Sequence, residues 1–435
     1  MKDKFKNKKL IAMIILLVIL LCLIIIHLSL ITDFKKTGNN IHKRVNHTAS
    51  LLPNGKVLVA GGLDDDLGGG PSNTAEIYDP KTQKFSLTRN LLVKRINPQS
   101  ILLKNGKVLI VGGVDDLPMY KNQIKIAELY DYKSGKFSRT GDLNIPRLNG
   151  FKLTLLNDGR VLVTGGLTTA YGIRKNNCEI YDPNTAKFKL ISPMKFKRDM
   201  HNAVLLKNGN VLIVGGNTTF NTIDEKSIQQ AAAGAGIEST TEIFNSKTEK
   251  FSLAGNIIYR IIPGASILLP DGNVLIIGGF GKKADDNNKF YDTKSVDREF
   301  YPKNRKYYTI PHSLYTAEIY DINKNKVVKV LQMNARHGRP TFNILKNGNI
   351  LIFGTNQKDK QRVVNTDYSI VYTKEDNNFE EIFDIKSNTF KKIKNIGYSR
   401  GQHTATTLKN GQVLIVGGTS YPRHNIPNLI LGELK

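Results

Sequence analysis

The chain has no tryptophan and only two cysteines among its 435 residues. Cys22 and Cys178 stand in unlike contexts, which excludes an internal disulfide framework, and they match no spacing typical of a metal site. Acidic residues are also scarce, because 37 Asp and Glu stand against 63 Lys and Arg, for a formal net charge of +26. Such an excess attracts polyanions, although a sequence rich in Lys, Asn and Ile carries part of it as compositional bias. No helix-turn-helix, zinc finger or arginine-rich helix accompanies the charge, so nucleic acid is not expected as a partner.

A basic segment and an apolar run open the chain. Residues 1–9 carry five lysines against one acid, and residues 10–32 contain no acid, Lys or Arg. This run is long enough to span a bilayer as a helix, and the basic flank predicts a cytoplasmic N-terminus and an exported remainder. A cleaved signal peptide is the alternative, but its apolar core is usually about 7–15 residues and ends at small residues, which are missing here. We therefore expect a single-pass signal anchor: a basic cytoplasmic segment (1–9), a transmembrane helix (10–32) and one exported domain (33–435).

One pattern recurs through the exported domain: an Asn-Gly or Asp-Gly turn, a short apolar run and a closing Gly pair. It is present in seven copies, and only Thr355 breaks a final Gly pair; the copies are residues 54–62, 105–113, 158–166, 208–216, 271–279, 347–355 and 410–418. The period begins near 50 residues, and each unit leaves room for four short strands, which is the signature of a β-propeller.

The first unit illustrates the expected blade. Its strands fall at about 46–52, 56–60 and 75–78 and around Phe85. Asn-Gly suits a two-residue hairpin in which both central residues have positive φ. The short apolar runs suit strands buried on both faces.

The two ends of the domain complete one blade. Residues 33–39 match the fourth-strand segments 84–90, 136–142 and 250–256, while the seventh unit has no fourth strand and ends with a third strand at residues 431–434. Pairing these ends would remove two exposed sheet edges. We therefore predict an all-β, seven-bladed β-propeller closed by its N- and C-terminal strands and preceded by one transmembrane helix.

These repeats resemble the kelch repeat, especially the bacterial form of the galactose-oxidase central domain. The shared signature is an Arg, an apolar strand, Asn/Asp-Gly, a second apolar strand, Gly-Gly and Glu-x-Tyr-Asp. Kelch blades usually carry a Trp in the fourth strand; the residues in that slot here are Phe34, Phe85, Phe137, Phe188, Phe251, Val327 and Phe390. Galactose oxidase uses copper with a Tyr–Cys crosslink, but Cys178 stands in a third strand and no copper set can be carried over. Kelch-like propellers include both binding modules and enzymes.

An Arg opens each predicted first strand and a Glu stands near the start of each third strand. The arginines are Arg44, Arg95, Arg147, Arg198, Arg260, Arg336 and Arg400; the glutamates are Glu76, Glu128, Glu179, Glu242, Glu318, Glu381 and Glu433. These strand starts share one rim of an up-down-up-down blade, so we expect one partly buried structural ion pair per blade. The alternative is a ring of arginines that binds an anion.

No catalytic, metal or cofactor site is expected. The sequence has no catalytic triad, nucleophile elbow or phosphate-binding loop. His47, His201 and His403 fall in blades one, four and seven, so a metal site built from them would need an improbable convergence, and packing is expected instead.

The segments between second and third strands vary most among the repeats, and variable loops on one face of a regular scaffold usually carry recognition. The longest holds five Tyr among basic residues, from which we predict a ligand site at Tyr301, Arg305, Tyr307 and Tyr308. The alternative is a loop that packs its own aromatics. The predicted function is a membrane-anchored extracytoplasmic module that binds a protein or an anionic glycan; the alternative is a sugar- or glycan-active enzyme, mutarotase-like, on the same scaffold.

Overall fold

The computed structural model describes residues 34–431 with internal gaps. The residues outside it are 1–33, 65–68, 116–123, 169–174, 218–238, 284–313, 336, 338–339, 355–361, 364–369, 372–379, 394–400, 419–427 and 432–435. The predicted cytoplasmic segment and transmembrane helix are therefore not described. Within the described ranges, no helix is long and apolar enough to cross a membrane.

Four-stranded antiparallel sheets build the described chain, which contains strands and turns but no helix. Written from first to fourth strand, they are β3 (Thr48–Leu51), β4 (Val57–Ala60), β7 (Ala75–Asp79), β8 (Lys84–Leu87); β9 (Gln99–Leu102), β10 (Val108–Val111), β11 (Glu128–Asp131), β12 (Lys136–Arg139); β13 (Lys152–Leu155), β14 (Val161–Thr164), β15 (Cys178–Asp182), β16 (Lys187–Ile191); β17 (Asn202–Leu205), β18 (Val211–Val214), β19 (Thr241–Asn245), β20 (Lys250–Leu253); β22 (Ala265–Leu268), β23 (Val274–Ile277), β25 (Thr316–Asp321), β26 (Lys326–Gln332); β27 (Thr341–Ile344), β28 (Ile350–Phe353), β31 (Glu381–Asp384), β32 (Thr389–Lys392); and β33 (Thr404–Thr407), β34 (Val413–Val416), β35 (Leu429–Leu431), β1 (Phe34–Lys36). The expected all-β class and strand order are confirmed.

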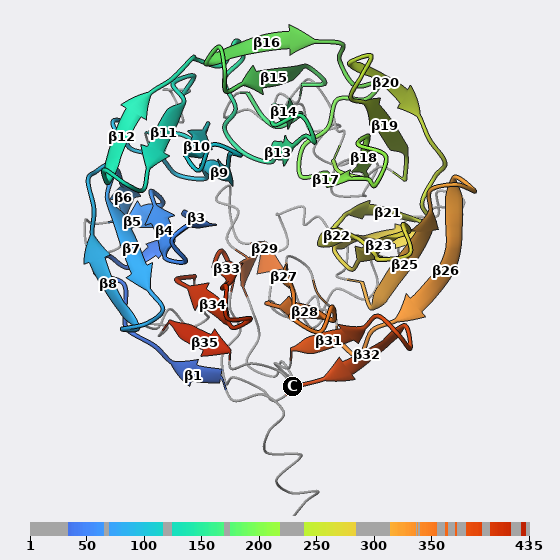
Figure 1. The fold of residues 1–435 in the computed structure, drawn as a ribbon. Coiled ribbons are helices and arrows are strands. Elements are labelled where there is room, and N and C mark those ends of the chain that lie inside the picture. The colour runs from blue at the N-terminus through green and yellow to red at the C-terminus, as the bar shows by residue number, and fades with distance from the viewer. Residues whose placement is uncertain are drawn as a thin grey trace, which may run out of the picture.

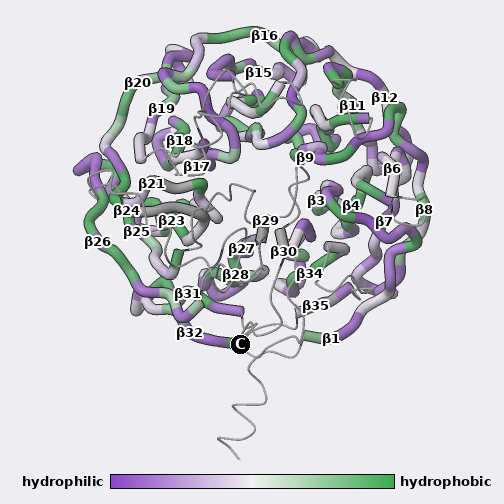
Figure 2. Tube along the Cα trace, turned by 180° about the vertical axis from the view of Figure 1, so that it is seen from behind, coloured by the Kyte–Doolittle hydropathy of each residue, from purple (hydrophilic) through white to green (hydrophobic). Residues whose placement is uncertain are grey.

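The sheets stand around a ring, with first strands such as β3 and β13 toward the centre and fourth strands such as β8 and β16 on the outside (Figure 1). The same ring is seen from behind in Figure 2. This arrangement is that of a propeller. Three small sheets accompany it: β2 (Arg44–Val45) with β5 (Leu63–Asp64) and β6 (Gly70–Pro71); β21 (Tyr259–Ile262) with β24 (Phe280–Lys283); and β29 (Arg362–Val363) with β30 (Ile370–Val371).

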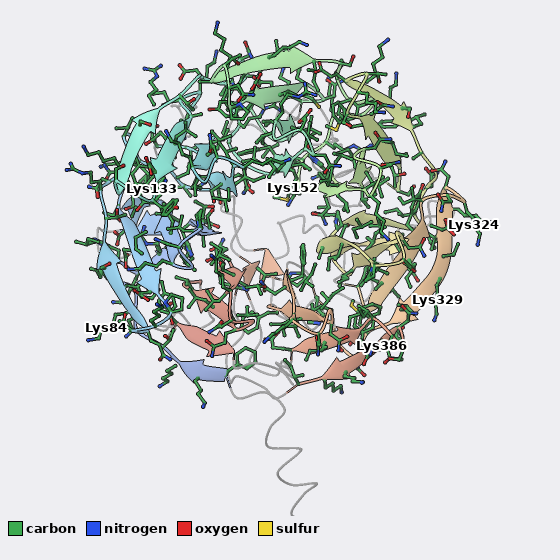
Figure 3. All side chains as sticks on the ribbon, viewed as in Figure 1. Lys84, Lys133, Lys152, Lys324, Lys329 and Lys386 are labelled. Atoms are coloured by element: carbon green, nitrogen blue, oxygen red, sulfur yellow. The ribbon has the colours of Figure 1, made fainter. Side chains whose placement is uncertain are left out.

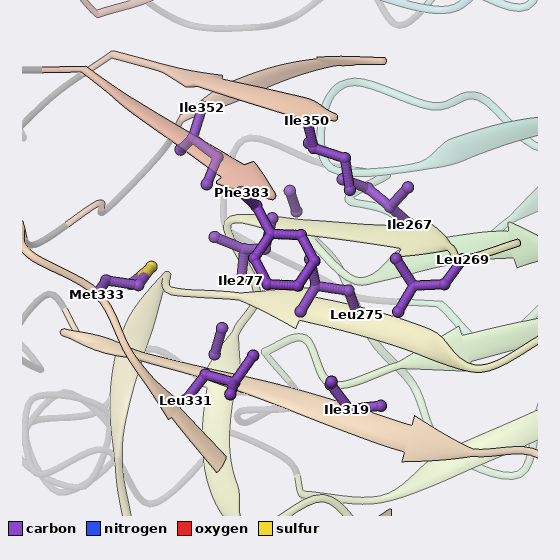
Figure 4. Packing of buried hydrophobic residues seen from close by; sticks show 12 residues of the cluster. Ile267, Leu269, Leu275, Ile277, Ile319, Leu331, Met333, Ile350, Ile352 and Phe383 are labelled. Atoms are coloured by element: carbon purple, nitrogen blue, oxygen red, sulfur yellow. The ribbon is translucent and has the colours of Figure 1, made fainter. Parts of the chain in front are cut away.

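The second strand of each sheet is fully buried, because sheets lie against both of its faces. Apolar side chains from neighbouring sheets form clusters between them. One such cluster joins Leu275 and Ile277 of β23 to Ile350, Ile352 and Phe383 of the next sheet (Figure 4). Burial of apolar area contributes about 25 cal/mol per Å², so these clusters are the main stabilising contribution.

The hairpins between first and second strands differ from the expected two-residue turn. Gly55 has φ of +85°, whereas Asn54 does not lie in the left-handed region, and the Gly55 amide donates to Leu52 O. This is a three-residue loop in which only the glycine needs positive φ. Asn54 stabilises the turn in another way, because its Oδ1 accepts the Lys56 amide at 3.1 Å.

The hairpins between first and second strands and those between third and fourth strands lie on one rim of the ring, which we name the turn face. It comprises the first-to-second turns, residues 52–56, 103–107, 156–160, 206–210, 269–273, 345–349 and 408–412, and the third-to-fourth turns, residues 79–84, 131–136, 182–187, 245–250, 321–326 and 384–389. All of these residues are described. The opposite rim carries the variable segments that follow the second strands.

Candidate functional site

The pair Arg44 and Glu76 shows how the predicted ionic residues are used. Arg44 Nη2 lies 2.6 Å from Glu76 Oε1, and both side chains are fully buried. Arg44 also donates to Gly61 O, the first glycine of the closing pair, at 2.9 Å. The Glu76 carboxylate accepts two backbone amides that precede Arg44, from Ile41 at 2.6 Å and His42 at 3.1 Å. The pair therefore joins the segment around Arg44, which precedes the first strand, to the ends of the second and third strands.

Three further sheets repeat this geometry with fully buried side chains. The Nη2–Oε1 distances are 2.7 Å for Arg95–Glu128, 3.2 Å for Arg147–Glu179 and 2.9 Å for Arg198–Glu242. Each Arg again donates to the first glycine of its Gly pair, at Gly112, Gly165 and Gly215. We name the four pairs the Arg–Glu belt.

Electrostatics in the belt favour a structural role. Burial lowers the pKa of Arg95 from its ordinary value, and the neighbouring Glu128 opposes that shift. Arginine is effectively always protonated in proteins. Its donors point to Glu128 Oε1, Gly112 O and Ile126 O. Charges paired this way stabilise one conformation and have few donors left for an anion.

The fifth sheet has a different register from the one predicted. Glu318 accepts the amides of Ile258 and Tyr259 at 2.8 and 2.9 Å, the same contacts that Glu76 makes. In the belt, Arg is the third residue after the first of these amides, and that spacing falls here on Ile261. The side chains of Arg260 and Ile261 are not described, so the Arg260–Glu318 pair stays a prediction. Burial raises the pKa of Glu318.

In the sixth sheet, a histidine stands in the position of the arginine. His337 Nε2 lies 3.2 Å from Glu381 Oε2, and its Nδ1 lies 3.2 Å from Gly354 O. The predicted partner of Glu381, Arg336, is outside the described residues. The spacing from the belt arginine to the first closing glycine is 17 residues in 44 to 61, 95 to 112 and 198 to 215 but 18 in 147 to 165, so the sequence leaves both 337 and 336 open, and the bonds of His337 decide.

The third strand of the seventh sheet begins at Leu429, two residues before the predicted start, and its register differs from the predicted one by four residues. Leu429 pairs with Ile415, as Glu76 pairs with Val59 in the first sheet. Glu433 was expected at that position; it follows the strand and, like Arg400, lies outside the described residues.

Sequence reasoning missed Asn428, which is 1% exposed. Its Nδ2 donates to Gly38 O at 3.2 Å and Asn40 Oδ1 at 3.1 Å, and its Oδ1 accepts the Gly417 amide at 3.1 Å. No repeat pattern predicts this residue, because it bonds two ends of the chain.

The buried histidines lie between sheets. His201 Nε2 lies 2.8 Å from Thr164 Oγ1 in the preceding sheet, and His47 Nε2 lies 2.8 Å from Thr404 Oγ1. Burial, together with the charge of Arg44, lowers the pKa of His47 to about 3, and burial lowers that of His201 well below 6.5. Both rings are therefore neutral at ordinary pH. Among the described residues, no group of three His, Cys, Asp or Glu side chains could hold a metal ion.

We expect the double variant Thr164→Val/His201→Phe to be less sensitive to acid than the wild type. In the unfolded chain an imidazole binds a proton below about pH 6.5, whereas buried His201 does not. Stability is therefore complete above that pH and falls as the pH drops, and the variant removes one such group. Val111 and Phe151 already pack together between the second and third sheets, so the new pair has a precedent.

Urea midpoints measured from pH 6.5 down to 3 would test this. His201→Phe alone is the control, since it leaves the buried Thr164 hydroxyl without its partner at a cost of about 1–3 kcal/mol at every pH. An unchanged acid slope in the double variant would contradict the expectation.

Cys178 is a structural thiol. It is fully buried, burial raises its pKa to about 12, and its Sγ lies 3.4 Å from Asn176 O. A reactive cysteine needs a lowered pKa and access to solvent. The described residues around it do not fit the copper–Cys chemistry of galactose oxidase.

The predicted ligand residues Tyr301, Arg305, Tyr307 and Tyr308 lie outside the described residues. The base of their segment is described: β24 pairs with β21 from Phe280–Ile262 to Lys283–Tyr259. Equivalent pairings hold the other segments at their bases, between β2 and β5 and at Ile96–Val114, Asn149–Leu167 and Asp199–Asn217. The variable segments of the first five sheets thus leave the scaffold from paired roots.

Comparison with known proteins agrees with this architecture. The kelch motif family model matches residues 44–91, which span the first sheet from Arg44 to Leu91. A solved fungal alcohol oxidase of the AA5 family, in complex with copper, is similar to this chain with a TM-score of 0.64 and 15% identity, over 93% of this chain and 76% of that one. At this identity the likeness concerns the fold alone. Together these findings show a propeller fold with a kelch motif in its first repeat.

Proposed function

We propose that this kelch-repeat propeller is a membrane-anchored, extracytoplasmic module that binds a protein or an acidic glycan. It would have seven blades, closed by pairing of its N- and C-terminal strands, and would be held by a single transmembrane helix at residues 10–32. The rim opposite the turn face would present the ligand site.

Contacts between the first and last sheets support the closed ring. β1 pairs with β35, from Phe34–Leu431 to Lys36–Leu429. An apolar cluster joins Leu414 and Val416 of β34 to Val57 and Tyr78 of the first sheet. The Gly418 amide donates to Arg44 O at 3.4 Å, the contact that Gly62 makes with Arg95 O between the first and second sheets.

One observation supports the binding function: each repeat has a buried, internally bonded part and a variable segment at one rim. The Arg–Glu belt and the second strands are buried and bonded within the scaffold. The segments that vary in length and chemistry follow the second strands, and those of the first five sheets leave one rim at paired roots. A rigid scaffold that positions variable loops is the usual arrangement of a recognition surface.

The blade-five segment, residues 280–315, is the proposed site. It combines Tyr side chains, which give rigid amphipathic contact area, with Lys and Arg, which attract anionic partners. We expect the triple variant Arg305→Ala/Tyr307→Ala/Tyr308→Ala to abolish binding to polygalacturonate or poly-glutamate and to leave the melting temperature nearly unchanged. Binding by the wild type should weaken as salt rises, because the Debye length falls from about 10 Å at 0.1 M to about 3 Å at 1 M.

The matched control is Tyr171→Ala/Arg174→Ala, which removes the same residue types from the blade-three segment on the same rim. If the control and the triple variant bind equally well, blade five does not hold the site. A triple variant that unfolds indicates that the aromatics pack within the loop. Release of sugar products from the glycan would favour the alternative, a sugar- or glycan-active enzyme, since fold does not decide between the two.

A further inference from the structure

The turn face carries a large excess of positive charge. Its turns contain 17 Lys or Arg and 8 Asp or Glu. Most of the lysines are exposed, among them Lys81, Lys133, Lys247 and Lys386. This is the kind of surface that attracts polyanions over a Debye length of about 8 Å at physiological salt.

The acids of this face are already bonded to neighbouring groups in the turns and the adjoining strands. Asp79 lies 2.9 Å from Lys56 Nζ and accepts the Lys81 amide. Both bonds lower the pKa of Asp79, and the bond to Lys56 contributes most. Asp384 likewise pairs with Lys391 Nζ at 2.9 Å and accepts the Lys386 amide. Their carboxylates are therefore turned to local partners, and the remaining lysines dominate what an approaching surface meets.

The cations are spread in two rings. Toward the centre, Lys104, Lys207 and Lys409 each reach the next sheet, where their Nζ atoms donate to Asn157 O, Pro270 O and Pro53 O. At the outside, the third-to-fourth turns carry lysines such as Lys133 and Lys386 around the circumference (Figure 3). Charge distributed over a whole face fits a flat, extended anion better than a small ligand.

We propose that the turn face rests on the anionic headgroups of the membrane that holds the chain. This rests on the proposed transmembrane helix at residues 10–32. β1 begins at this face with Phe34, one residue beyond Asp33, and a residue spans at most about 3.6 Å. The bilayer surface is then the extended anion nearest to the turn face, and each lysine near such a surface contributes about a fivefold factor in binding. The ligand-binding rim consequently points away from the membrane.

Lysine acylation of the full chain in vesicles tests this contact. The vesicles contain phosphatidylcholine alone or with phosphatidylglycerol, and mass spectrometry reads each lysine. We expect Lys104 and Lys207 to be acylated more slowly in the anionic vesicles only, with the difference lost in about 1 M salt. The quadruple variant Lys81→Gln/Lys133→Gln/Lys247→Gln/Lys386→Gln should lose most of that protection.

The matched control, Arg89→Gln/Lys94→Gln/Lys125→Gln/Lys195→Gln, removes four exposed charges from the opposite rim and should retain the protection. Carbonate extraction separates two kinds of failure. A chain released by carbonate overturns the transmembrane anchor. A chain that stays in the membrane, yet is acylated equally in both vesicles or is equally protected in both, overturns the electrostatic contact and leaves the anchor standing.

Discussion

Glu128→Ala is expected to lower the free energy of unfolding by about 3–5 kcal/mol, the usual cost of breaking a buried ion pair by removing one partner. Glu128 and Arg95 are both fully buried, with Nη2 and Oε1 2.7 Å apart. The substitution leaves the guanidinium with carbonyl partners alone. It also removes the acceptor of the Leu92 and Val93 amides.

The matched control is Asp142→Ala, which breaks an exposed pair with Arg139 at 2.6 Å. Exposed ion pairs are screened by water and salt, so little or no change is expected. Glu128→Gln preserves the shape and one acceptor oxygen and should fall between the two. Urea midpoints give the comparison. A small loss for Glu128→Ala, no larger than that for Asp142→Ala, would revive the ring of arginines as an anion site.

Much of this fold was predictable because each repeat has the same local pattern of glycines and apolar residues. Gly62 has φ of +96°, and a Cβ there would lie 2.5 Å from Val45 O, so a glycine is required and recurs. Apolar runs such as Val57–Ala60 are buried on both faces and admit only apolar residues. Because the pattern occurs seven times, the sequence predicts a propeller over other all-β architectures.

The pairing of charged side chains was less predictable, because it depends on register to a single residue. At residues 336–339, two arginines and a histidine compete for one position, and the bonds to Glu381 and Gly354 select His337. Near the C-terminus, Gly432-Glu433 imitates the repeat, but pairing with β34 and β1 places the strand at Leu429–Leu431. Composition cannot reveal a register that long-range pairing decides.

The proposed ligand site was the hardest part to predict from the sequence, because the segment that would hold it varies. Residues 280–315 follow no repeat, so neither periodicity nor spacing constrains them. Their aromatic and basic composition suits recognition and loop packing alike. Only a variant that separates binding from stability distinguishes these roles, which is the purpose of the Arg305, Tyr307 and Tyr308 substitutions.

Removing residues 428–435 is expected to cost more stability than any single substitution. It deletes β35, which lies between β34 and β1, so both lose their backbone partner. Each backbone group left buried without a bond costs about 1–3 kcal/mol, and several are affected at once. Asn428, which bonds Gly38, Asn40 and Gly417, is also lost.

We expect this truncated chain to aggregate, since exposed strand edges pair with other chains. The control is the shorter truncation of residues 432–435, which keeps β35 and should melt like the full chain. Thermal unfolding and size-exclusion chromatography read both. If the longer truncation melts like the full chain, the terminal strands do not hold the ring together. If the shorter truncation is equally damaging, Glu433 contributes to the fold although it follows the strand. The register that places Leu429 at the glutamate position would then not explain the stability of the seventh sheet.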